Sequence, residues 1–247
     1  MPRAKRHFIP GGHYIWHITH RCHKKEFLLK FKKDKRAWLK WLYRAKKTFR
    51  IRILDYVITS NHVHLLVFDD GRPEAIARSM HLAAGQTAQQ FNRRKKRCGA
   101  FWQDRYHATA VDKGSYLRRC LVYIDLNMVR AGVVRHPEHW PFGGYAELMR
   151  QKPRWGLIDE PALLEALGFS SPSRHRESRR EWVEAKLLEK RLSREPAWTE
   201  SVAIGRKEFV NKIKVELGAR GTGKRIEEKD QEFYLREDHP SYFGPKK

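Results

Sequence analysis

Hydrophobic and polar positions alternate, or recur at helical spacing, in a regular series over the first 132 residues. Alternating β-branched and aromatic residues are typical of strands, and apolar residues three or four positions apart are typical of helices. These patterns predict strands over 14–19, 51–59, 62–69 and 106–111, and helices over 34–50, 73–94 and 115–130. Asp34 and Ser115 are expected N-caps. Pro73 suits a first helical turn, and Gly132 is expected to end the last helix.

The predicted elements run in the order βαββαβ, followed by one extra helix. This is the order of the ferredoxin-like fold, in which a four-stranded antiparallel sheet carries two helices on one face. We therefore expect an α+β fold with one domain over residues 1–150. The extra helix is expected to cover part of the other face of the sheet.

The pattern changes beyond residue 150. Prolines and the serine-rich stretch 170–173 are typical of a linker, and residues 174–194 form a highly charged helical stretch. A second amphipathic pattern covers 205–217, whereas 225–247 shows little regular pattern. We expect residues 151–247 to form a basic, mainly helical appendage. It either binds DNA or packs on the main domain as a solvated cap.

Charge narrows the classes of partner. The 247 residues carry 52 Lys and Arg against 28 Asp and Glu, a formal net charge of +24. Such an excess favours a polyanionic partner, with nucleic acid ahead of an anionic membrane surface. Aromatic residues are interleaved with the basic ones in the first 50 positions, where they either stack on unpaired bases or belong to the core.

Other features of the sequence argue against a membrane helix, a secretory signal and a disulfide framework. No stretch approaches the roughly 18 apolar residues of a membrane helix, and no apolar segment of a secretory signal follows the basic start. The three cysteines, Cys22, Cys98 and Cys120, are too few and too far apart for a disulfide framework and point to a reducing interior.

Two histidines on the third predicted strand are candidate metal ligands. Side chains alternate across a strand, so His62 and His64 share one face while Val63 lies on the other. Two imidazoles on one face can bind one divalent cation. The alternative is that both are ordinary histidines of the sheet.

The extra helix offers a nucleophile. Tyr123 and Asn127 are four residues apart and therefore share a helix face. A tyrosine hydroxyl becomes an effective nucleophile when a metal polarises the phosphorus or when its proton is withdrawn. The Asn127 amide oxygen could complete a metal site beside the histidines, if the helix packs over their face. Otherwise Tyr123 is a core residue and Asn127 a polar residue near the helix end.

Three segments together resemble a known family. They are Thr59-Ser60-Asn61-His62-Val63-His64-Leu65-Leu66-Val67, then Phe101-Trp102-Gln103-Asp104-Arg105-Tyr106, then Tyr123-Ile124-Asp125-Leu126-Asn127-Met128-Val129-Arg130-Ala131-Gly132. They are similar to the REP-associated tyrosine transposases, relatives of the single-tyrosine insertion-sequence transposases of the HUH class. The early Thr19-His20-Arg21-Cys22 also fits, and the resemblance covers about residues 8–150. Met128 departs from the family, which usually has proline there.

The resemblance implies roles for individual residues. His62, His64 and Asn127 would hold Mg²⁺ or Mn²⁺, and Tyr123 would be the catalytic nucleophile. The implied activity is cleavage and rejoining of single-stranded DNA next to a hairpin through a 5′-phosphotyrosine intermediate. Candidate DNA contacts are Arg3, Lys5, Arg6, Arg21, Arg93, Arg94, Arg105, Arg118, Arg119 and Arg130.

The resemblance also implies partners, an oligomeric state and a cellular location. The partners would be single-stranded and hairpin DNA, namely REP-type palindromes with an adjacent guide tetranucleotide, and not a membrane. The protein would be a monomer or homodimer in the cytoplasm, associated with the nucleoid.

Two other functions remain open from the sequence. A catalytically silent DNA- or RNA-binding protein, such as a repressor, would need only the basic surface and its aromatics. A zinc hydrolase would use the histidine pair with an activating glutamate, but none lies close to His62 in sequence, the nearest being Glu74. Separately, His17, His20, Cys22 and His23 cluster in sequence and could bind zinc, although their spacing fits no familiar finger.

Overall fold

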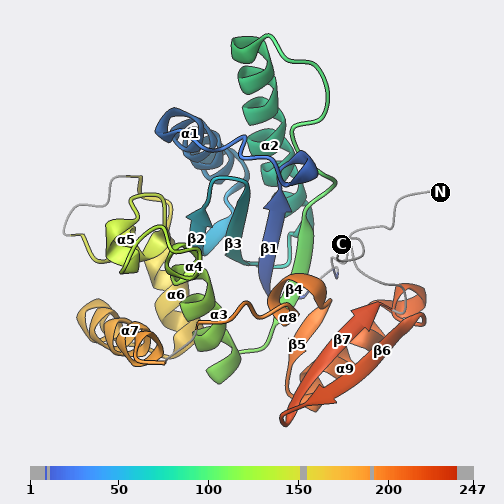
Figure 1. Ribbon diagram of the computed structural model, residues 1–247. Coiled ribbons are helices and arrows are strands. Elements are labelled where there is room, and N and C mark those ends of the chain that lie inside the picture. The colour runs from blue at the N-terminus through green and yellow to red at the C-terminus, as the bar shows by residue number, and fades with distance from the viewer. Residues whose placement is uncertain (1–8, 10–11, 151–154, 190–191, 238–247) are drawn as a thin grey trace.

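A seven-stranded sheet is the centre of the computed structural model, which describes residues 9, 12–150, 155–189 and 192–237. The strands are β1 (Ile15–Arg21), β2 (Arg52–Ile58), β3 (His62–Phe68), β4 (His107–Val111), β5 (Ala203–Gly205), β6 (Lys224–Lys229) and β7 (Glu232–Glu237). They lie in the order β2-β3-β1-β4-β5-β7-β6 (Figure 1). All neighbours are antiparallel except β4 and β5.

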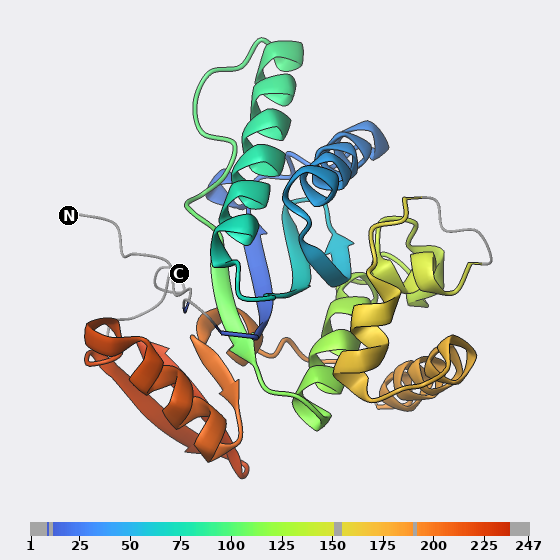
Figure 2. The same cartoon turned by 180° about the vertical axis from the view of Figure 1, so that it is seen from behind.

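The first four strands confirm the ferredoxin-like prediction. Their order β2-β3-β1-β4 is antiparallel throughout, and β2 and β3 form a hairpin. The helices α1 (Lys32–Phe49) and α2 (Pro73–Lys95) cross on one face of this sheet (Figure 2). Pro73 begins α2 as predicted, because proline is compatible with the first helical turn.

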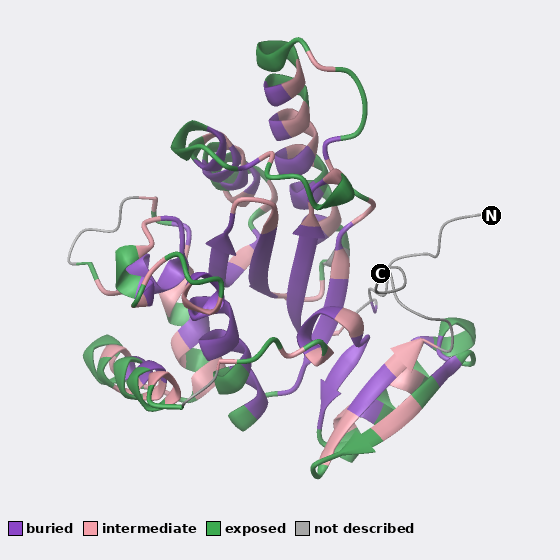
Figure 3. Ribbon diagram, in the orientation of Figure 1, coloured by how far each residue is buried: buried purple, intermediate pink, exposed green. Residues whose placement is uncertain are grey.

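Side-chain alternation in β3 sorts its residues between two cores. Val63, Leu65 and Val67 pack in the core under α1 and α2. Leu66 packs on the opposite face, in the core that includes α3 (Ser115–Asp125). His64 therefore points from a fully covered strand toward α3, and Figure 3 shows β1 and β3 as buried.

Two predicted caps differ from the structure. Asp34 is the third residue of α1, not its N-cap; it is buried and forms an ion pair with Arg94 on α2. Ser115 is the first residue of α3, preceded by Gly114. The predicted helix 115–130 is interrupted at Leu126, after which α4 (Asn127–Arg130) continues in nearly the same direction because backbone hydrogen bonds span the interruption.

The C-terminal region is helical, and it also extends the sheet. The remaining elements are α5 (Gly144–Leu148), α6 (Glu160–Leu167), α7 (Pro172–Leu187), α8 (Ala197–Glu200) and α9 (Lys207–Glu216), with 3-10 turns at His23–Lys25, Pro137–His139 and Gly218–Arg220. Strand β5 pairs with β4, and the hairpin of β6 and β7 follows. The tail expected to be irregular from 225 onward thus forms strands up to Glu237.

A buried ion-pair network fixes α7 to the first domain. The Arg179 guanidinium contacts Asp55 on β2 at 2.6 Å and Asp125 at the end of α3 at 2.9 Å. All three side chains are almost completely buried. The region after residue 150 therefore shares its sheet and its buried charges with the first 150 residues, while the domain division at 150 stays a prediction. No helix in the described ranges is both long and apolar enough to cross a bilayer.

Candidate active site

The turn before β3 positions His62. Thr59 Oγ1 accepts hydrogen bonds from the backbone N–H groups of Asn61 (3.2 Å) and His62 (3.0 Å), which is how threonine stabilises a tight turn. The Asn61 amide group donates through Nδ2 to the Lys25 carbonyl oxygen at 3.1 Å, so its Oδ1 faces His62. His62 Nδ1 lies 2.7 Å from that oxygen and must carry the proton. The lone pair of His62 is therefore on Nε2.

The same reasoning fixes the tautomer of His64. His17 Nδ1 lies 2.8 Å from the carbonyl oxygen of Trp198, which can only accept, so His17 carries its proton on Nδ1. Its Nε2 is then an acceptor, and His64 Nδ1, at 2.9 Å, donates to it. His64 thus also presents a lone pair on Nε2. The rings of His62 and His64 lie 4.9 Å apart between centroids.

Asn127 lies next to the free nitrogen of His64. Its Nδ2 is 3.1 Å from His64 Nε2, so the amide N–H donates to the lone pair that a metal would use. Rotation of the amide group exchanges its nitrogen and oxygen. The side chain that closes the site can therefore act as an oxygen ligand.

Tyr123 packs directly against these groups. Its ring centroid is 5.9 Å from that of His64 and 6.1 Å from that of His17, edge to face in both cases. The Arg130 guanidinium lies 4.2 Å from the Tyr123 ring centroid and donates to the Tyr123 carbonyl oxygen at 2.8 Å. The tyrosine, both histidines and the amide thus meet within one chain.

Burial sets the protonation states. Burial, together with the charges of Arg21 and Arg130, lowers the pKa of His62 to about 3. Burial also lowers the pKa of His64 well below its usual value. Both rings are therefore neutral at pH 7, as metal ligands must be. Burial raises the pKa of the Tyr123 phenol, while the charges of Arg130 and Arg194 oppose that rise.

The donor set fits a divalent cation. Two neutral imidazoles with lone pairs on Nε2 and one amide are ligands that first-row divalent ions accept. No cluster of three His, Cys, Asp or Glu with metal-binding geometry occurs among the described residues. The assignment of His62, His64 and Asn127 as ligands stays a prediction.

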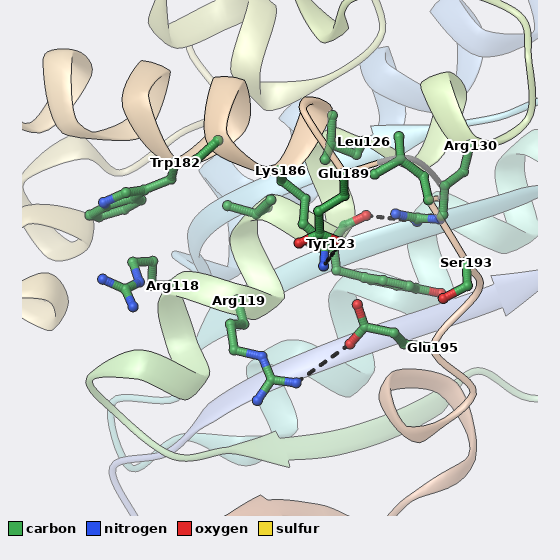
Figure 4. A pocket seen from close by; sticks show the side chains of 13 residues that line it. Arg118, Arg119, Tyr123, Leu126, Arg130, Trp182, Lys186, Glu189, Ser193 and Glu195 are labelled. Carbon is green, nitrogen blue, oxygen red and sulfur yellow. Dashed lines mark hydrogen bonds and ion pairs between the residues drawn. The ribbon is translucent and has the colours of Figure 1, made fainter. Parts of the chain in front are cut away.

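The predicted DNA contacts fall into separate groups. Arg118, Arg119 and Arg130 line the same pocket as Tyr123 (Figure 4). Arg21 lies at the end of β1, where its charge lowers the pKa of His62 and where Tyr123 opposes the fall of the Arg21 pKa on burial. Arg105 lines a second pocket, of about 520 Å³, on the other face of the sheet.

The other predicted cations lie away from Tyr123. Arg93 and Arg94 are at the far end of α2, which projects beyond the sheet in Figure 1. Arg94 is paired there with Asp34. Arg3, Lys5 and Arg6 lie outside the described residues.

The four residues considered for zinc are not brought together. His17 faces α3, whereas His20 points to the opposite side of β1 and stacks on Trp102 at 4.1 Å. Burial raises the pKa of the Cys22 thiol to about 12, which opposes the thiolate form that binds metal.

Two groups of the site were not predicted from the sequence. His17 supports His64, and the backbone carbonyl of Trp198 supports His17. His17 lies on a predicted strand, but the sequence does not show the register of that strand against β3. Nothing in the sequence indicates the carbonyl.

Fold and site together define a ferredoxin-like domain with a histidine pair on strand β3 and a tyrosine on helix α3. Residues 12–127 match the model of the family described as "Transposase IS200 like". The matched part, 116 of the 247 residues, is similar to transposases of this class, and it bears out over those residues the resemblance found in the sequence.

Solved structures give two further similarities. One is a REP-associated tyrosine transposase bound to a REP hairpin, with 20% identity, a TM-score of 0.46, and coverage of 61% of this chain and 87% of that one. The other is a protein of Deinococcus radiodurans R1 described as a transposase, with 11% identity, a TM-score of 0.34, and coverage of 53% and 97%. No curated protein matches the chain.

Proposed function

We propose that this protein cleaves and rejoins single-stranded DNA beside a hairpin, with Tyr123 as the nucleophile. The observation that carries the proposal is the contact of the Tyr123 ring with His64, whose free nitrogen faces Asn127, all in one chain. A protein that only binds DNA has no need of this combination. The motifs that resemble REP-associated transposases support REP-type palindromes with a guide tetranucleotide as the DNA class.

The reaction transfers a phosphate from one oxygen to another. The Tyr123 hydroxyl oxygen attacks the scissile phosphorus and forms the new P–O bond, while the bond from phosphorus to the 3′ oxygen of the preceding nucleotide breaks. The phenol proton ends on that 3′ oxygen, directly or through water. The products are a 5′-phosphotyrosine and a free 3′ hydroxyl, and attack by another 3′ hydroxyl reverses the step.

Residues of the chain have distinct parts in this reaction. His62, His64 and Asn127 would hold Mg²⁺ or Mn²⁺. When bound, the cation polarises the scissile phosphate and neutralises its charge. Arg130, stacked on the Tyr123 ring, stabilises negative charge on the phenol oxygen as its proton leaves. Burial of Tyr123 excludes water, which would otherwise compete as a nucleophile.

The structure argues against the zinc-hydrolase alternative. That mechanism requires a carboxylate beside the metal-bound water. Neither His62 nor His64 contacts a carboxylate in the described part of the chain; their neighbours are Thr59, Asn61, His17 and Asn127.

A covalent-adduct assay tests the proposal. Labelled single-stranded DNA with a hairpin, taken from the flanks of the gene, is incubated with the protein and Mg²⁺, Mn²⁺ or EDTA. We expect a denaturant-resistant adduct that requires metal and is absent in Tyr123→Phe. Tyr116→Phe on the same helix is the matched control and should retain the adduct. Tight DNA binding without an adduct under every metal would favour the silent binding protein instead.

A further inference from the structure

A pocket of about 520 Å³ lies on the face of the sheet opposite Tyr123. It is lined by the C-terminal end of β1, the middle of α2 and the segment between α2 and β4. In Figure 2 this segment runs back alongside α2 toward β4. The volume is within the roughly 300–1,000 Å³ of pockets that hold small organic ligands. The described residues that line it do not include His62, His64, Tyr123, Asn127 or Arg130.

Gly85 forms part of the α2 wall, in the interior of that helix. Glycine there destabilises a helix relative to alanine, because it loses more conformational freedom on folding. The packing does not require it: a Cβ at this position would have no described atom of its surroundings within 4 Å. Gly144, in contrast, is required, since the Asp55 carboxylate occupies the place of its Cβ. Gly85 therefore keeps the helix backbone open to the pocket, as glycine does where a ligand approaches closely.

The indole ring of Trp102 is held beside Gly85 and keeps part of its surface exposed. Its Nε1 donates to the carbonyl oxygen of Ala84, the residue before Gly85, at 3.0 Å. The His20 ring stacks on it with 4.1 Å between centroids. His20 Nε2 donates in turn to the carbonyl oxygen of Asp104 at 2.8 Å. A ligand that covers Gly85 thus lies against an aromatic ring that is already fixed in position, which favours stacking of a planar group.

Cations border the pocket. Arg105 lines it, and the guanidinium of Arg105 has no ion-pair partner among the described residues. The carboxylate of Asp104 also lines it, and Oδ1 of that carboxylate accepts the backbone N–H of Arg105 at 2.7 Å. Arg93, Lys95 and Lys96 are exposed at the end of α2, where the segment that lines the pocket begins. A planar ligand carrying phosphate groups suits this combination of aromatic ring and cations.

The pocket and the proposed active site lie at the same end of β1, on its two faces. His20 lines the pocket, whereas the next residue, Arg21, is paired with His62 in the register of β1 and β3. The Arg21 carbonyl oxygen accepts the backbone N–H of Gln103 at 2.9 Å, so the segment that lines the pocket is joined directly to this strand end. The end of β1 thus separates the two sites, and one DNA strand passing over it would contact both.

We propose that this pocket holds one unpaired base of the DNA on which the protein acts, at a distance from the cleaved phosphate. The inference rests on the proposed function, which supplies DNA as the ligand. The base covers Gly85 and stacks on Trp102, while Arg105 and the cations at the end of α2 contact neighbouring phosphates. Bases within a duplex have both faces covered by their neighbours, so only an unpaired base presents a face to the indole. The pocket thereby selects DNA with an unpaired nucleotide near the cleavage site.

Side chains added at position 85 test this assignment. Gly85→Ala places one methyl group in the pocket, and Gly85→Leu places a larger apolar side chain there. Gln90→Leu is the matched control, because Gln90 is exposed on the same helix and does not line the pocket. All three are made in the Tyr123→Phe background, which prevents adduct formation. Affinity for single-stranded DNA with a hairpin is measured for each protein, and urea denaturation measures stability.

We expect Gly85→Ala to change stability and DNA binding in opposite directions. The midpoint of urea denaturation should rise, because alanine favours the helix, while DNA affinity falls. Gly85→Leu should weaken DNA binding by about tenfold, as is typical for loss of a stacked base, whereas Gln90→Leu should leave it nearly unchanged. Equal affinities of Gly85→Leu and Gln90→Leu would overturn the inference. A lower urea midpoint for Gly85→Ala would also overturn it, because the fold itself would then require the glycine.

A scan with abasic nucleotides shows whether the lost contact is to a base. An abasic residue is placed in turn at every unpaired position of the DNA. One position should weaken binding by about tenfold in Tyr123→Phe and have little effect once Gly85→Leu already excludes that base. If every abasic position has the same effect on both proteins, the pocket holds no base and the inference is overturned.

The two proposals fail separately in these experiments. An adduct with the wild-type protein, without any abasic position that depends on Gly85, would sustain the proposed reaction and overturn the base-binding pocket. A position that depends on Gly85, without an adduct under any metal, would sustain the pocket and overturn the reaction.

Discussion

His17 Nε2 lies 2.9 Å from His64 Nδ1, so a histidine of β1 holds a histidine of β3 in the tautomer that leaves Nε2 free. His17 is held in turn by the Trp198 carbonyl oxygen, which belongs to α8 in the C-terminal region. A backbone group more than a hundred residues away thereby orients a proposed metal ligand. Such supporting hydrogen bonds fix the ring orientation and basicity of ligating histidines.

The first prediction concerns this support. His17→Phe removes the acceptor for His64 Nδ1–H, so His64 loses its preferred tautomer and orientation. We expect the affinity for Mn²⁺ to fall by about 10- to 100-fold. His17→Gln retains a side-chain acceptor and donor and should recover part of the affinity. Mn²⁺ titration followed by electron paramagnetic resonance measures the change.

Nitrogen NMR of labelled histidine provides a second readout that does not depend on activity. In the wild type without metal, the His64 proton should be on Nδ1; in His17→Phe, a population protonated on Nε2 should appear. Unchanged Mn²⁺ affinity and tautomer in His17→Phe would show that His17 is only a packing residue. Thermal unfolding of each variant checks that the fold is retained.

The second prediction concerns Arg130. Its charge lowers the pKa of the Tyr123 phenol, which burial raises. Arg130→Gln should therefore move the rising limb of the pH–rate profile for adduct formation to higher pH. At neutral pH the rate should fall on the order of 10²-fold, as when a charge-stabilising group is removed from an active site. Arg130→Lys retains the charge, so its rate of adduct formation should fall less than that of Arg130→Gln.

DNA affinity distinguishes this role from a phosphate contact. If Arg130 acts on Tyr123, the rate and its pH dependence change more than the affinity for uncleaved DNA. If affinity alone falls and the pH profile keeps its position, then Arg130 contacts the DNA backbone and does not influence the nucleophile.

The ferredoxin-like half of the fold was predictable because its residues follow simple periodicities. In β3 the alternation of Val63, Leu65 and Val67 with His64 and Leu66 matches the two cores that the structure shows. Such alternation depends only on the strand itself. Strands β6 and β7 lack it, because β6 is almost entirely charged and β7 has charged residues at both ends. Their hydrogen bonds come from pairing with neighbouring strands, β7 with β5 and β6 with β7.

The site was predictable only in its separate parts. His62 and His64 share a face by alternation, and Tyr123 and Asn127 by helical spacing. That these two faces meet depends on how α3 packs on the sheet, which local spacing does not determine. His17 contacts His64 diagonally across two strands, in a register where His64 is opposite Thr19. Register follows from the whole sheet and cannot be read from one segment.

The third prediction concerns the buried network that anchors α7. Arg179→Met would leave the carboxylates of Asp55 and Asp125 buried without a cation. The pKa values of both carboxyl groups are already raised by burial, and Arg179 opposes that rise. We expect the free energy of unfolding to fall by about 3–5 kcal/mol, the cost of breaking a buried pair. Urea denaturation measures it.

The exposed neighbour Arg180 supplies the control for this change. Arg180→Met on the same helix should alter stability by less than about 0.5 kcal/mol, as is usual for surface positions. Combining Arg179→Met with Asp55→Asn and Asp125→Asn removes the uncompensated charges and should restore part of the loss. Equal effects of Arg179→Met and Arg180→Met would contradict a stabilising role for the network.

The fourth prediction concerns acid sensitivity. His175 on α7 is completely buried, neither ring nitrogen has a hydrogen-bond partner among the described residues, and burial lowers its pKa to about 3. Because the unfolded chain binds a proton below about pH 6.5 and the folded chain does not, His175 costs stability as pH falls from about 6.5 toward 3. The slope is about 1.4 kcal/mol per pH unit for one such histidine. His17 and His62, with similarly lowered pKa values, act in the same direction.

His175→Leu isolates the contribution of one ring. The variant should gain about 2 kcal/mol relative to wild type on going from neutral pH to about pH 5, because leucine cannot bind the proton that favours the unfolded chain. Urea denaturation at the two pH values measures the difference, and His139→Leu, at an exposed histidine, controls for histidine replacement in general. A gain that is the same at both pH values would mean that the buried ring exerts its cost through packing alone and not through its protonation.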